Sequence, residues 1–169
     1  MQKWMKLSFM IYILLLIKFI IFKYPYEQLV EISSDWKAEV IFVGLGSANF
    51  MPFKTIRMYI KYADRLNSFE NLAGNIIAFV PFGMMLPLIN TRTSIWKYVF
   101  ANALVFVIGI ELFQLVSAFG VFDVDDIILN CFGVILGYVI YIKSRSMFPV
   151  FDKKIRIEEE RYGTTFEEN

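Results

Sequence analysis

The sequence predicts an all-α fold: a polytopic membrane helix bundle of four transmembrane helices, plus an interfacial amphipathic helix in the first external loop. Three observations lead to this prediction. Hydrophobic residues make up 57% and aromatic residues 18% of the 169-residue chain, which is more than a small water-soluble core buries. Four segments approach the roughly 20 apolar residues that cross a bilayer. The single cysteine and the absence of histidine exclude a disulfide scaffold and His-based catalysis.

The first predicted span covers about residues 7–22 and carries Lys18 near its far end. A lysine at that position can reach the membrane interface with its ammonium group. A basic start followed by an apolar run also resembles a signal peptide. However, residues 22–26 (FKYPY) offer no small-residue cleavage site. We therefore expect a retained helix.

The remaining spans cover about residues 72–89, 96–118 and 127–142, and an external loop of about residues 23–70 precedes them. In that loop, residues 40–53 are apolar but too short to span, so a re-entrant or surface-lying segment is expected. Residues 54–66 are predicted to form an amphipathic helix at the membrane surface. Its apolar face would hold Ile56, Tyr59, Ile60 and Ala63, and its basic face Lys54, Arg57 and Lys61. A solvated basic face without a specific ligand explains the pattern equally well.

The distribution of lysine and arginine predicts the orientation in the cell membrane. Positive residues flank the N-terminus, the loop between the second and third spans, and the end of the fourth span, whereas the loop between the third and fourth spans holds three aspartates. Both termini of this multi-pass protein are therefore expected in the cytoplasm. Residues 1–142 would form the membrane domain, and residues 143–169 a charged cytoplasmic tail. The basic residues of the first external loop argue mildly against this orientation.

Polar side chains gather near the predicted outer ends of three spans. The second span opens with Asn71 and Asn75, four residues apart, and the third ends with Glu111 and Gln114, three apart. Such spacings place each pair on one helix face. A stripe runs along the fourth span through Asp123, Asp126, Asn130, Gly133 and Gly137. The amides could simply join the helices by hydrogen bonds of about 1 kcal/mol each. Neighbouring carboxylates repel each other, which favours a functional role for Glu111, Asp123 and Asp126.

Glycine and proline positions predict how the second and fourth spans meet. The Gly133-x-x-x-Gly137 pair permits close approach of another helix. Pro81, Gly83 and Pro87 lie within the second span, and proline removes a backbone donor and bends or breaks a helix. We expect a break near residues 79–83, with the second span packed on the glycine stripe.

Four sequence stretches together resemble the VanZ-like family of small bacterial membrane proteins: NFMPFKTI, NLAGNIIAFVPFGMMLP, IELFQLV and FDVDDIILNCFGVILGY. The resemblance covers about residues 49–142. The matching positions are Asn49, Pro52, Phe53, Asn75, Pro81, Gly83, Glu111, Gln114, Asp123, Asp126, Asn130 and Gly133. Family members often carry an arginine before the Phe-Asp pair, where this chain has Gly120. The resemblance implies a cell-envelope role in the context of resistance to the glycopeptide teicoplanin.

The leading hypothesis is a non-enzymatic envelope protein without a cofactor. It would bind a lipid-linked cell-wall intermediate or a lipoglycopeptide at the outer-leaflet polar cluster, in contact with membrane lipids. The expected ligand-binding residues are Asn75, Glu111, Gln114, Asp123, Asp126 and Asn130, with Lys54 and Arg57 facing phosphates. The net charge of +1 gives no reason to expect a nucleic-acid partner.

Two other functions are compatible with the sequence. In a membrane-embedded, metal-dependent enzyme acting on a lipid-linked phosphate, Glu111, Asp123 and Asp126 would supply oxygen ligands to Mg²⁺. No activated nucleophile is apparent for that reaction, and no catalytic residue is assigned. Intramembrane carboxylates also allow a transporter or proton relay, although four spans without internal repeats fit this poorly.

Overall fold

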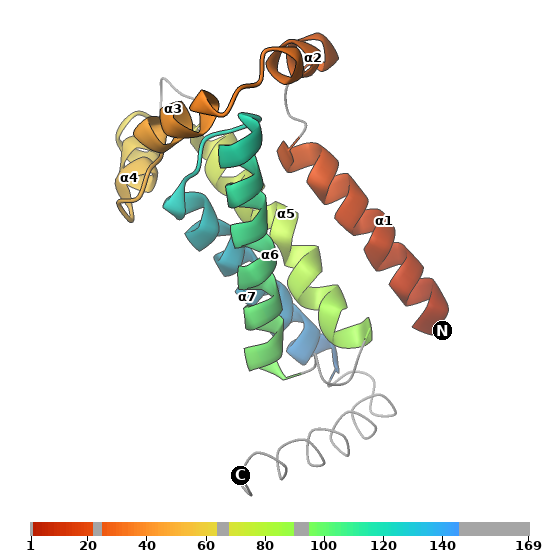
Figure 1. Ribbon diagram of the computed structural model, residues 1–169. Helices are drawn as coiled ribbons and strands as arrows, with labels where there is room; N and C mark the ends of the chain where they lie inside the picture. The colour runs from red at the N-terminus through yellow and green to blue at the C-terminus, as the bar shows by residue number, and fades with distance from the viewer. Residues whose placement is uncertain (1, 22–24, 64–67, 90–94, 146–169) are drawn as a thin grey trace, which may run out of the picture.

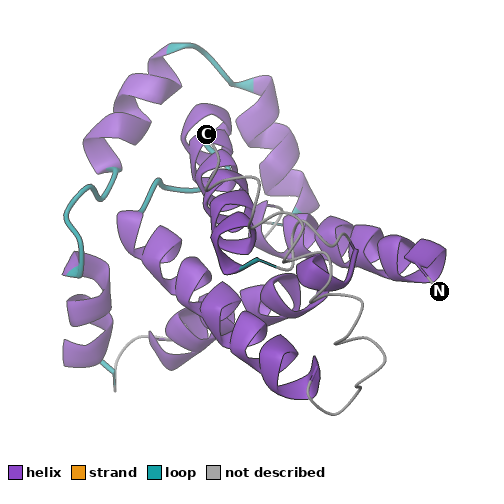
Figure 2. Cartoon of the chain, turned by 90° about the horizontal axis from the view of Figure 1, so that it is seen from below, coloured by secondary structure: helices purple, strands orange, loops and turns teal. Residues whose placement is uncertain are grey.

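The computed structural model describes residues 2–21, 25–63, 68–89 and 95–145. Within these ranges the chain is all-α, as predicted, and forms no strand apart from one isolated bridge between Asn49 and Asp123 (Figures 1 and 2). The helices are α1 (Gln2–Ile21), α2 (Tyr26–Ser34), α3 (Glu39–Ser47), α4 (Lys54–Lys61), α5 (Ser68–Ile89), α6 (Trp96–Ser117) and α7 (Val124–Arg145).

Three helices of the described chain are long and apolar enough to cross a membrane: Glu70–Ile89 of α5, Trp96–Ser117 of α6 and Val124–Ser144 of α7. The first predicted span forms α1, which carries three lysines and is not among these three. A fourth span therefore stays a prediction. Of the predicted cytoplasmic tail, residues 146–169 lie outside the described residues.

The long helices alternate in direction (Figure 1). The α1 and α6 helices run one way, and α5 and α7 run the other. Helices α2 to α4 lie at the end of the bundle where α1 and α6 finish and where α5 and α7 begin. The turn between α6 and α7 lies at this same end, which we call the loop end. All polar positions singled out in the sequence belong to the loop end or to the first turns below it.

Close contact between α5 and α7 forms the centre of the bundle. These two helices share the most extensive contact of any pair. A Cβ atom on Gly83, Gly133 or Gly137 would overlap a backbone carbonyl oxygen of the facing helix. Since only glycine lacks that atom, the three positions let the two backbones approach more closely than any other residue would allow.

The break predicted within the second span does not occur. Helix α5 continues through Pro81 and Pro87 from Ser68 to Ile89. Its proline-containing segment is held by side-chain packing, because Phe79 and Phe82 are buried in the core. The Tyr12 hydroxyl of α1 also donates to the Ala78 carbonyl oxygen at 2.7 Å. Packing and a hydrogen bond from a neighbouring helix thus support α5 in the turn before Pro81.

A small apolar core joins the long helices, while much of the outer surface is also apolar. The core contains Leu16, Phe79, Phe82, Val99, Ala103, Val107, Ile110 and Val134. Aromatic rings reinforce it, with Phe82 stacked on Phe106 at 5.4 Å between ring centroids. On α6, Val105, Leu112 and Val116 are exposed. Large apolar side chains directed outward along a helix suit a hydrocarbon environment.

The short helices at the loop end differ in detail from the prediction. The helix expected over residues 54–66 is α4 and ends at Lys61, and residues 64–66 of that prediction lie outside the described residues. Most of α3 comes from the first part of the apolar segment 40–53. The expected apolar face of α4 divides into two, because α4 packs against α5 and α7 on one side. Ile56 and Tyr59 are half-buried there, whereas Ile60 is 66% exposed.

Candidate functional site

The polar residues of the loop end form two separate groups. One group, the anchoring network, consists of Asn49, Thr55, Glu111, Asp123 and Asp125 and ties the loops to the first turn of α7. The other group lines a cavity between α1 and the remaining long helices. The two groups differ in what their polar atoms contact, so their chemical capacities differ as well.

The anchoring network begins with a backbone bridge between the loop before α4 and the start of α7. The Asn49 N–H donates to the Phe122 carbonyl oxygen at 2.9 Å, and the Val124 N–H donates to the Asn49 carbonyl oxygen at 3.0 Å. The Asn49 side chain donates to Asp123 Oδ1 at 2.8 Å and to Thr55 Oγ1 at 3.1 Å. The Thr55 hydroxyl then donates to Asp123 Oδ2 at 2.6 Å. Both carboxylate oxygens of Asp123 therefore hold the loop.

Asp125 caps the N-terminus of α4 from a distant part of the chain. Its fully buried carboxylate accepts hydrogen bonds from the backbone N–H groups of Phe53, Thr55 and Ile56. The first N–H groups of a helix have no partner inside it, and the helix dipole favours a negative charge there. Phe53 precedes the helix in the left-handed region, with φ of 65°, which turns the chain into α4.

Glu111 belongs to the anchoring network. It is buried, with 1% of its surface exposed, and its Oε2 accepts a hydrogen bond from the Asp123 N–H at 3.0 Å. Asp123 lies one residue before α7, and its Oδ1 accepts from the Asp125 N–H at 2.8 Å, as an N-cap residue does. The carboxylates of Glu111 in α6 and of Asp123 just before α7 thus fix the turn between these helices.

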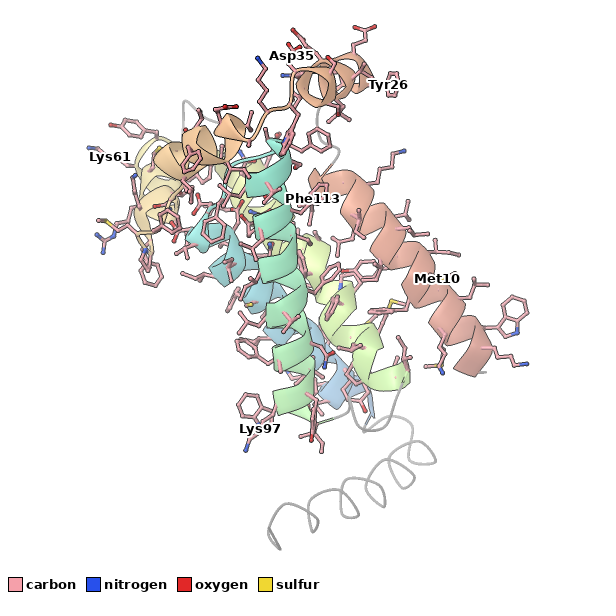
Figure 3. The ribbon with its side chains drawn as sticks, viewed as in Figure 1. Met10, Tyr26, Asp35, Lys61, Lys97 and Phe113 are labelled. Atoms are coloured by element: carbon pink, nitrogen blue, oxygen red, sulfur yellow. The ribbon has the colours of Figure 1, made fainter. Side chains whose placement is uncertain are left out.

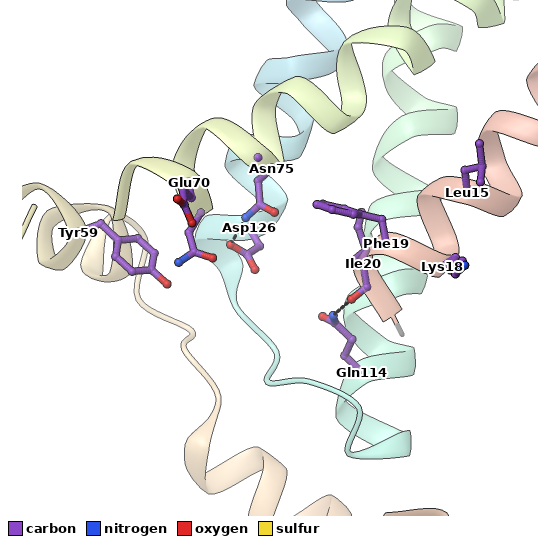
Figure 4. A pocket seen from close by; sticks show the side chains of 11 residues that line it. Leu15, Lys18, Phe19, Ile20, Tyr59, Glu70, Asn75, Gln114 and Asp126 are labelled. Carbon is purple, nitrogen blue, oxygen red and sulfur yellow. Dashed lines mark hydrogen bonds between the residues drawn. The ribbon is translucent and has the colours of Figure 1, made fainter. Parts of the chain in front are cut away.

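The cavity has a volume of about 820 Å³ and two chemically different walls (Figure 4). We call it the amphipathic cavity. Its lining residues come from α1, α4, α5, α6 and α7. They are Leu15, Lys18, Phe19, Ile20, Tyr59, Glu70, Asn71, Gly74, Asn75, Gln114 and Asp126. Carboxylates and amides of the three apolar helices face apolar side chains of α1 across the opening.

Hydrogen bonds orient the polar wall. Asn75 Nδ2 of α5 donates to Asp126 Oδ1 of α7 at 2.6 Å. Gln114, only 4% exposed, donates from Nε2 to the Ile20 carbonyl oxygen at the end of α1, at 3.3 Å. Its amide oxygen is turned away from Ile20 toward the cavity (Figure 4). Each of these amide nitrogens has a second N–H, so the wall combines amide donors with carboxylate and amide acceptors.

The opposite wall is apolar and belongs to α1. Leu15, Phe19 and Ile20 supply it, and Lys18 adds one cation beside them. Tyr59 of α4 closes the cavity near Asp126 (Figure 4). Burial raises the pKa of the Tyr59 hydroxyl above its ordinary value of 10.0, and the charges of Asp126 and Asp123 raise this pKa further. Tyr59 is thus a neutral hydroxyl at physiological pH.

The predicted ligand-binding residues are distributed over different surroundings. Asn75, Gln114 and Asp126 line the amphipathic cavity. Glu111 and Asp123 belong instead to the anchoring network. Asn130 is buried, and its Oδ1 has no hydrogen-bond partner within the described parts of the chain. Lys54 and Arg57 are exposed on α4 and do not line the cavity.

Several cavity residues were not assigned as ligand-binding from the sequence: Leu15, Lys18, Phe19, Ile20, Tyr59, Glu70, Asn71 and Gly74. The position of Asn71 was predictable from the sequence, since it lies four residues before Asn75 on the same helix face. The buried Asp125 was also missed, because it lies outside the stripe that runs through Asp126.

A metal site finds no support in this part of the molecule. Within residues 2–21, 25–63, 68–89 and 95–145, no three His, Cys, Asp or Glu side chains come together in a way that could hold a metal ion. Glu111 and Asp123, two of the three ligands expected from the sequence, bind backbone, amide and hydroxyl donors.

Comparison with known proteins places these features in a family. Residues 9–148 match the model of the VanZ/LLP1 family. The chain is also 34% identical over 74 residues to "Protein VanZ" of Enterococcus faecium, an alignment that covers 44% of this chain and 45% of that protein. The chain thus spans under half the length of this curated relative. No solved structure matches the chain.

Proposed function

The chain belongs to the VanZ/LLP1 family, and from this premise we propose that it is a cell-envelope membrane protein that binds an amphiphile in the amphipathic cavity. The amphiphile is a lipid-linked cell-wall intermediate or a lipoglycopeptide, and binding it contributes to teicoplanin resistance. The observation behind the proposal is the pairing of a polar wall on α5, α6 and α7 with an apolar wall on α1. A ligand with a polar head and a hydrocarbon chain satisfies both walls, whereas a fully polar ligand leaves the apolar wall in contact with water.

The proposed orientation places the cavity at the outer leaflet. In this arrangement α1 is a fourth span and both termini are cytoplasmic, so the loop end faces outward. Exposed apolar residues of α1, including Met10, Ile11 and Leu14, support its contact with lipid. The three aspartates at the start of α7 support an external position for the turn before it, because cytoplasmic loops are enriched in lysine and arginine.

Helix α4 is proposed to lie at the membrane interface beside the cavity. Its exposed surface mixes Lys54 and Arg57 with Phe53, Met58 and Ile60. Cations next to apolar side chains suit the boundary between headgroups and acyl chains. The two basic residues would contact phosphate groups of surrounding lipids, while the cavity receives the bound amphiphile. This separates their role from direct ligand binding in the cavity.

The polar wall offers hydrogen bonds suited to sugar and peptide groups. Asn71, Asn75 and Gln114 present amides, and Glu70 and Asp126 present carboxylates. The bond from Asn75 to Asp126 and the bond from Gln114 to the Ile20 carbonyl oxygen hold both amides in place before a ligand arrives. A site with side chains already fixed loses less entropy on binding.

Filling the cavity tests the proposal. A Cβ on Gly74, which lines the cavity, would meet no atom within 4 Å, so a side chain can be added there without displacing the backbone, and we expect the ring of Gly74→Phe to fill part of the cavity. Gly109→Phe is the matched control, because Gly109 of α6 is equally unobstructed but does not line the cavity. We expect Gly74→Phe to abolish the teicoplanin protection of cells that carry the chain and to lower binding of a fluorescent lipoglycopeptide at least tenfold.

For this comparison, both variants must be present in the membrane at equal levels. Protection retained in Gly74→Phe would remove the amphipathic cavity from the mechanism. Protection lost in both variants would point to a general effect of phenylalanine on folding and would not support the cavity. Only selective loss in Gly74→Phe supports the proposed function.

A further inference from the structure

Helix α6 has one buried face and one exposed face. The buried residues are Val99, Ala103, Val107, Ile110, Glu111, Gln114 and Leu115, and the helix packs against α3, α5 and α7. Figure 3 shows α6 at the front of the bundle, with Lys97 near its beginning and Phe113 near its end. On the exposed face, Val105 is 73% exposed. A helix of membrane-spanning length thus presents one side to lipid or to another protein.

Five exposed residues of α6 form a line that we call the α6 seam. They follow one another in steps of three, four, three and four residues: Asn102, Val105, Gly109, Leu112 and Val116. Two α-helices that pack along each other at a small crossing angle repeat their contacts with this seven-residue period. The apolar residues of the seam suit lipid and protein equally, so the choice between the two depends on Asn102 and Gly109.

Asn102 places a polar amide on the exposed side of α6. It lies six residues after Trp96, the first residue of the helix, which is about 9 Å along the helix axis. Its Nδ2 donates to the Tyr98 carbonyl oxygen of the preceding turn at 2.7 Å. Among the described residues the amide makes no other hydrogen bond, so a second N–H and the amide oxygen are left for a partner. Polar groups in hydrocarbon are costly without a partner, which favours a polar neighbour at this position.

Gly109 leaves a notch in the same seam, about two helical turns after Asn102. A Cβ atom on Gly109 would meet no atom within 4 Å, whereas one on Gly83 would overlap a carbonyl oxygen of α7. Packing inside the chain therefore requires glycine at position 83 and does not require it at position 109. Small residues on the face of a membrane helix let a second helix approach closely. A helix from outside the chain would use this notch.

We propose that the α6 seam pairs with the α6 seam of a second copy of this chain. An amide is both donor and acceptor, so Asn102 can exchange N–H···O bonds with Asn102 of the second copy. Copies of one membrane protein share one orientation in the bilayer, so a two-fold axis between them runs along the membrane normal. Equal residues then meet at equal depth. This symmetry brings amide to amide at Asn102 and notch to notch at Gly109.

Pairing through the α6 seam leaves the amphipathic cavity of each copy open. Gln114, which lines the cavity, lies nine residues after Val105. Because successive helical residues point about 100° apart, nine residues place Gln114 on the side of α6 opposite to Val105. The two cavities of a pair are therefore directed away from the shared axis, and pairing does not depend on the amphiphile that each cavity receives.

Cysteine cross-linking of the full-length protein in proteoliposomes locates the contact. Cys131, the single cysteine of the chain, is first replaced by serine. Single cysteines are then introduced on the seam as Val105→Cys or Leu112→Cys. The controls are Ile77→Cys on α5 and Phe132→Cys on α7, which are exposed apolar positions of the other long helices. Oxidation should join two copies through the seam positions and not through the controls, whereas equal yields at all four positions would overturn the proposal.

Substitution of Asn102 separates pairing from folding. Asn102→Leu places an apolar side chain in a membrane-spanning helix, so it does not oppose insertion or folding. We expect the dissociation constant of the pair, measured by energy transfer between labelled copies as lipid is added, to rise about tenfold, which corresponds to about 1.4 kcal/mol. Asn102→Gln keeps an amide and should pair more tightly than Asn102→Leu. A dissociation constant that is unchanged or lower in Asn102→Leu would overturn the role of the amide.

Gly109→Phe separates this inference from the proposed function. A ring at the notch should prevent close approach and abolish pairing, while amphiphile binding is retained because Gly109 does not line the cavity. Pairing that persists in Gly109→Phe, or an unsubstituted chain that stays monomeric at every lipid ratio, would show that lipid covers the seam and would leave the cavity proposal intact. Amphiphile binding that is insensitive to Gly74→Phe would overturn the proposed function and leave pairing intact.

Discussion

Asp125 is predicted to hold α4 against the bundle, and its replacement by alanine should release that helix. The carboxylate accepts three backbone N–H bonds at the start of α4. Hydrogen bonds to charged groups contribute about 1.5–3 kcal/mol each, and a buried donor left without a partner costs about 1–3 kcal/mol. Because α4 has eight residues, it is too short to remain helical in water by itself. Opening the helix is therefore the least costly response, and we expect Asp125→Ala to favour it by about 3–4 kcal/mol.

Trypsin can measure this opening directly. Helix α4 begins at Lys54, ends at Lys61 and contains Arg57, so each opening exposes cleavage sites. When opening and closing are fast, the cleavage rate follows the equilibrium population of the open form. A shift of 3–4 kcal/mol then raises cleavage about a hundredfold or more, because 1.4 kcal/mol corresponds to a factor of ten.

Two controls make the result specific. Asp125→Asn keeps one carbonyl oxygen in place and should raise cleavage of α4 to a smaller extent. Cleavage at Lys37, which precedes α3 in an exposed turn, should not change in either variant. Cleavage of α4 in Asp125→Ala at the rate of the unsubstituted protein would show that the carboxylate does not hold the helix, and the anchoring network would lose its assigned role.

Three further outcomes follow from the packing and charges. Gly133→Val should destabilise the protein by about 1–3 kcal/mol or more, because its side chain would overlap the Ile76 carbonyl oxygen. The loss of stability is measured as a lower temperature at which the buried thiol of Cys131 becomes reactive. Tyr59→Phe should remove one of the phenolates that titrate above pH 10.0, since folding raises the pKa of Tyr59 above its ordinary value of 10.0. Tyr59 contributes stability below about that pH and loses it at higher pH, so the alkaline loss of stability should weaken in the variant. Glu111→Gln keeps an acceptor for the N–H of the α6–α7 turn, so amphiphile binding should be unchanged, whereas loss of binding with full stability would reassign Glu111 to the ligand.

Local patterns in the sequence predict the helices well. Hydropathy gives the approximate positions of α5, α6 and α7, because lipid-facing and buried sides are both apolar and produce long uninterrupted runs. The spacing of Gly133 and Gly137 anticipated the close contact with α5, since a missing Cβ has the same consequence in any helix pair. The break at Pro81 was not realised, because contacts with neighbouring helices decide whether a proline interrupts a helix.

The candidate site was only partly predictable for a geometric reason. Helical periodicity places Asn75 and Asp126 correctly, and the structure joins them at 2.6 Å. Extending the same periodicity to Asp123 fails, because α7 begins one residue later and Asp123 turns back as its N-cap. The apolar wall depends on how α1 packs against the other long helices. No local spacing of residues predicts this packing.

Adjacent aspartates at the start of α7 connect the anchoring network with the cavity. Successive helical residues point about 100° apart, so Asp125 faces α4 while Asp126 faces Asn75 and the cavity. The network therefore fixes the rotation of the first turn of α7, and with it the position of the Asp126 carboxylate. The same contacts fix α4, which carries Tyr59 to the cavity edge. Since a binding wall is most selective when its supports are rigid, substitutions that remove the hydrogen bonds of the network should alter ligand preference even though no network residue lines the cavity.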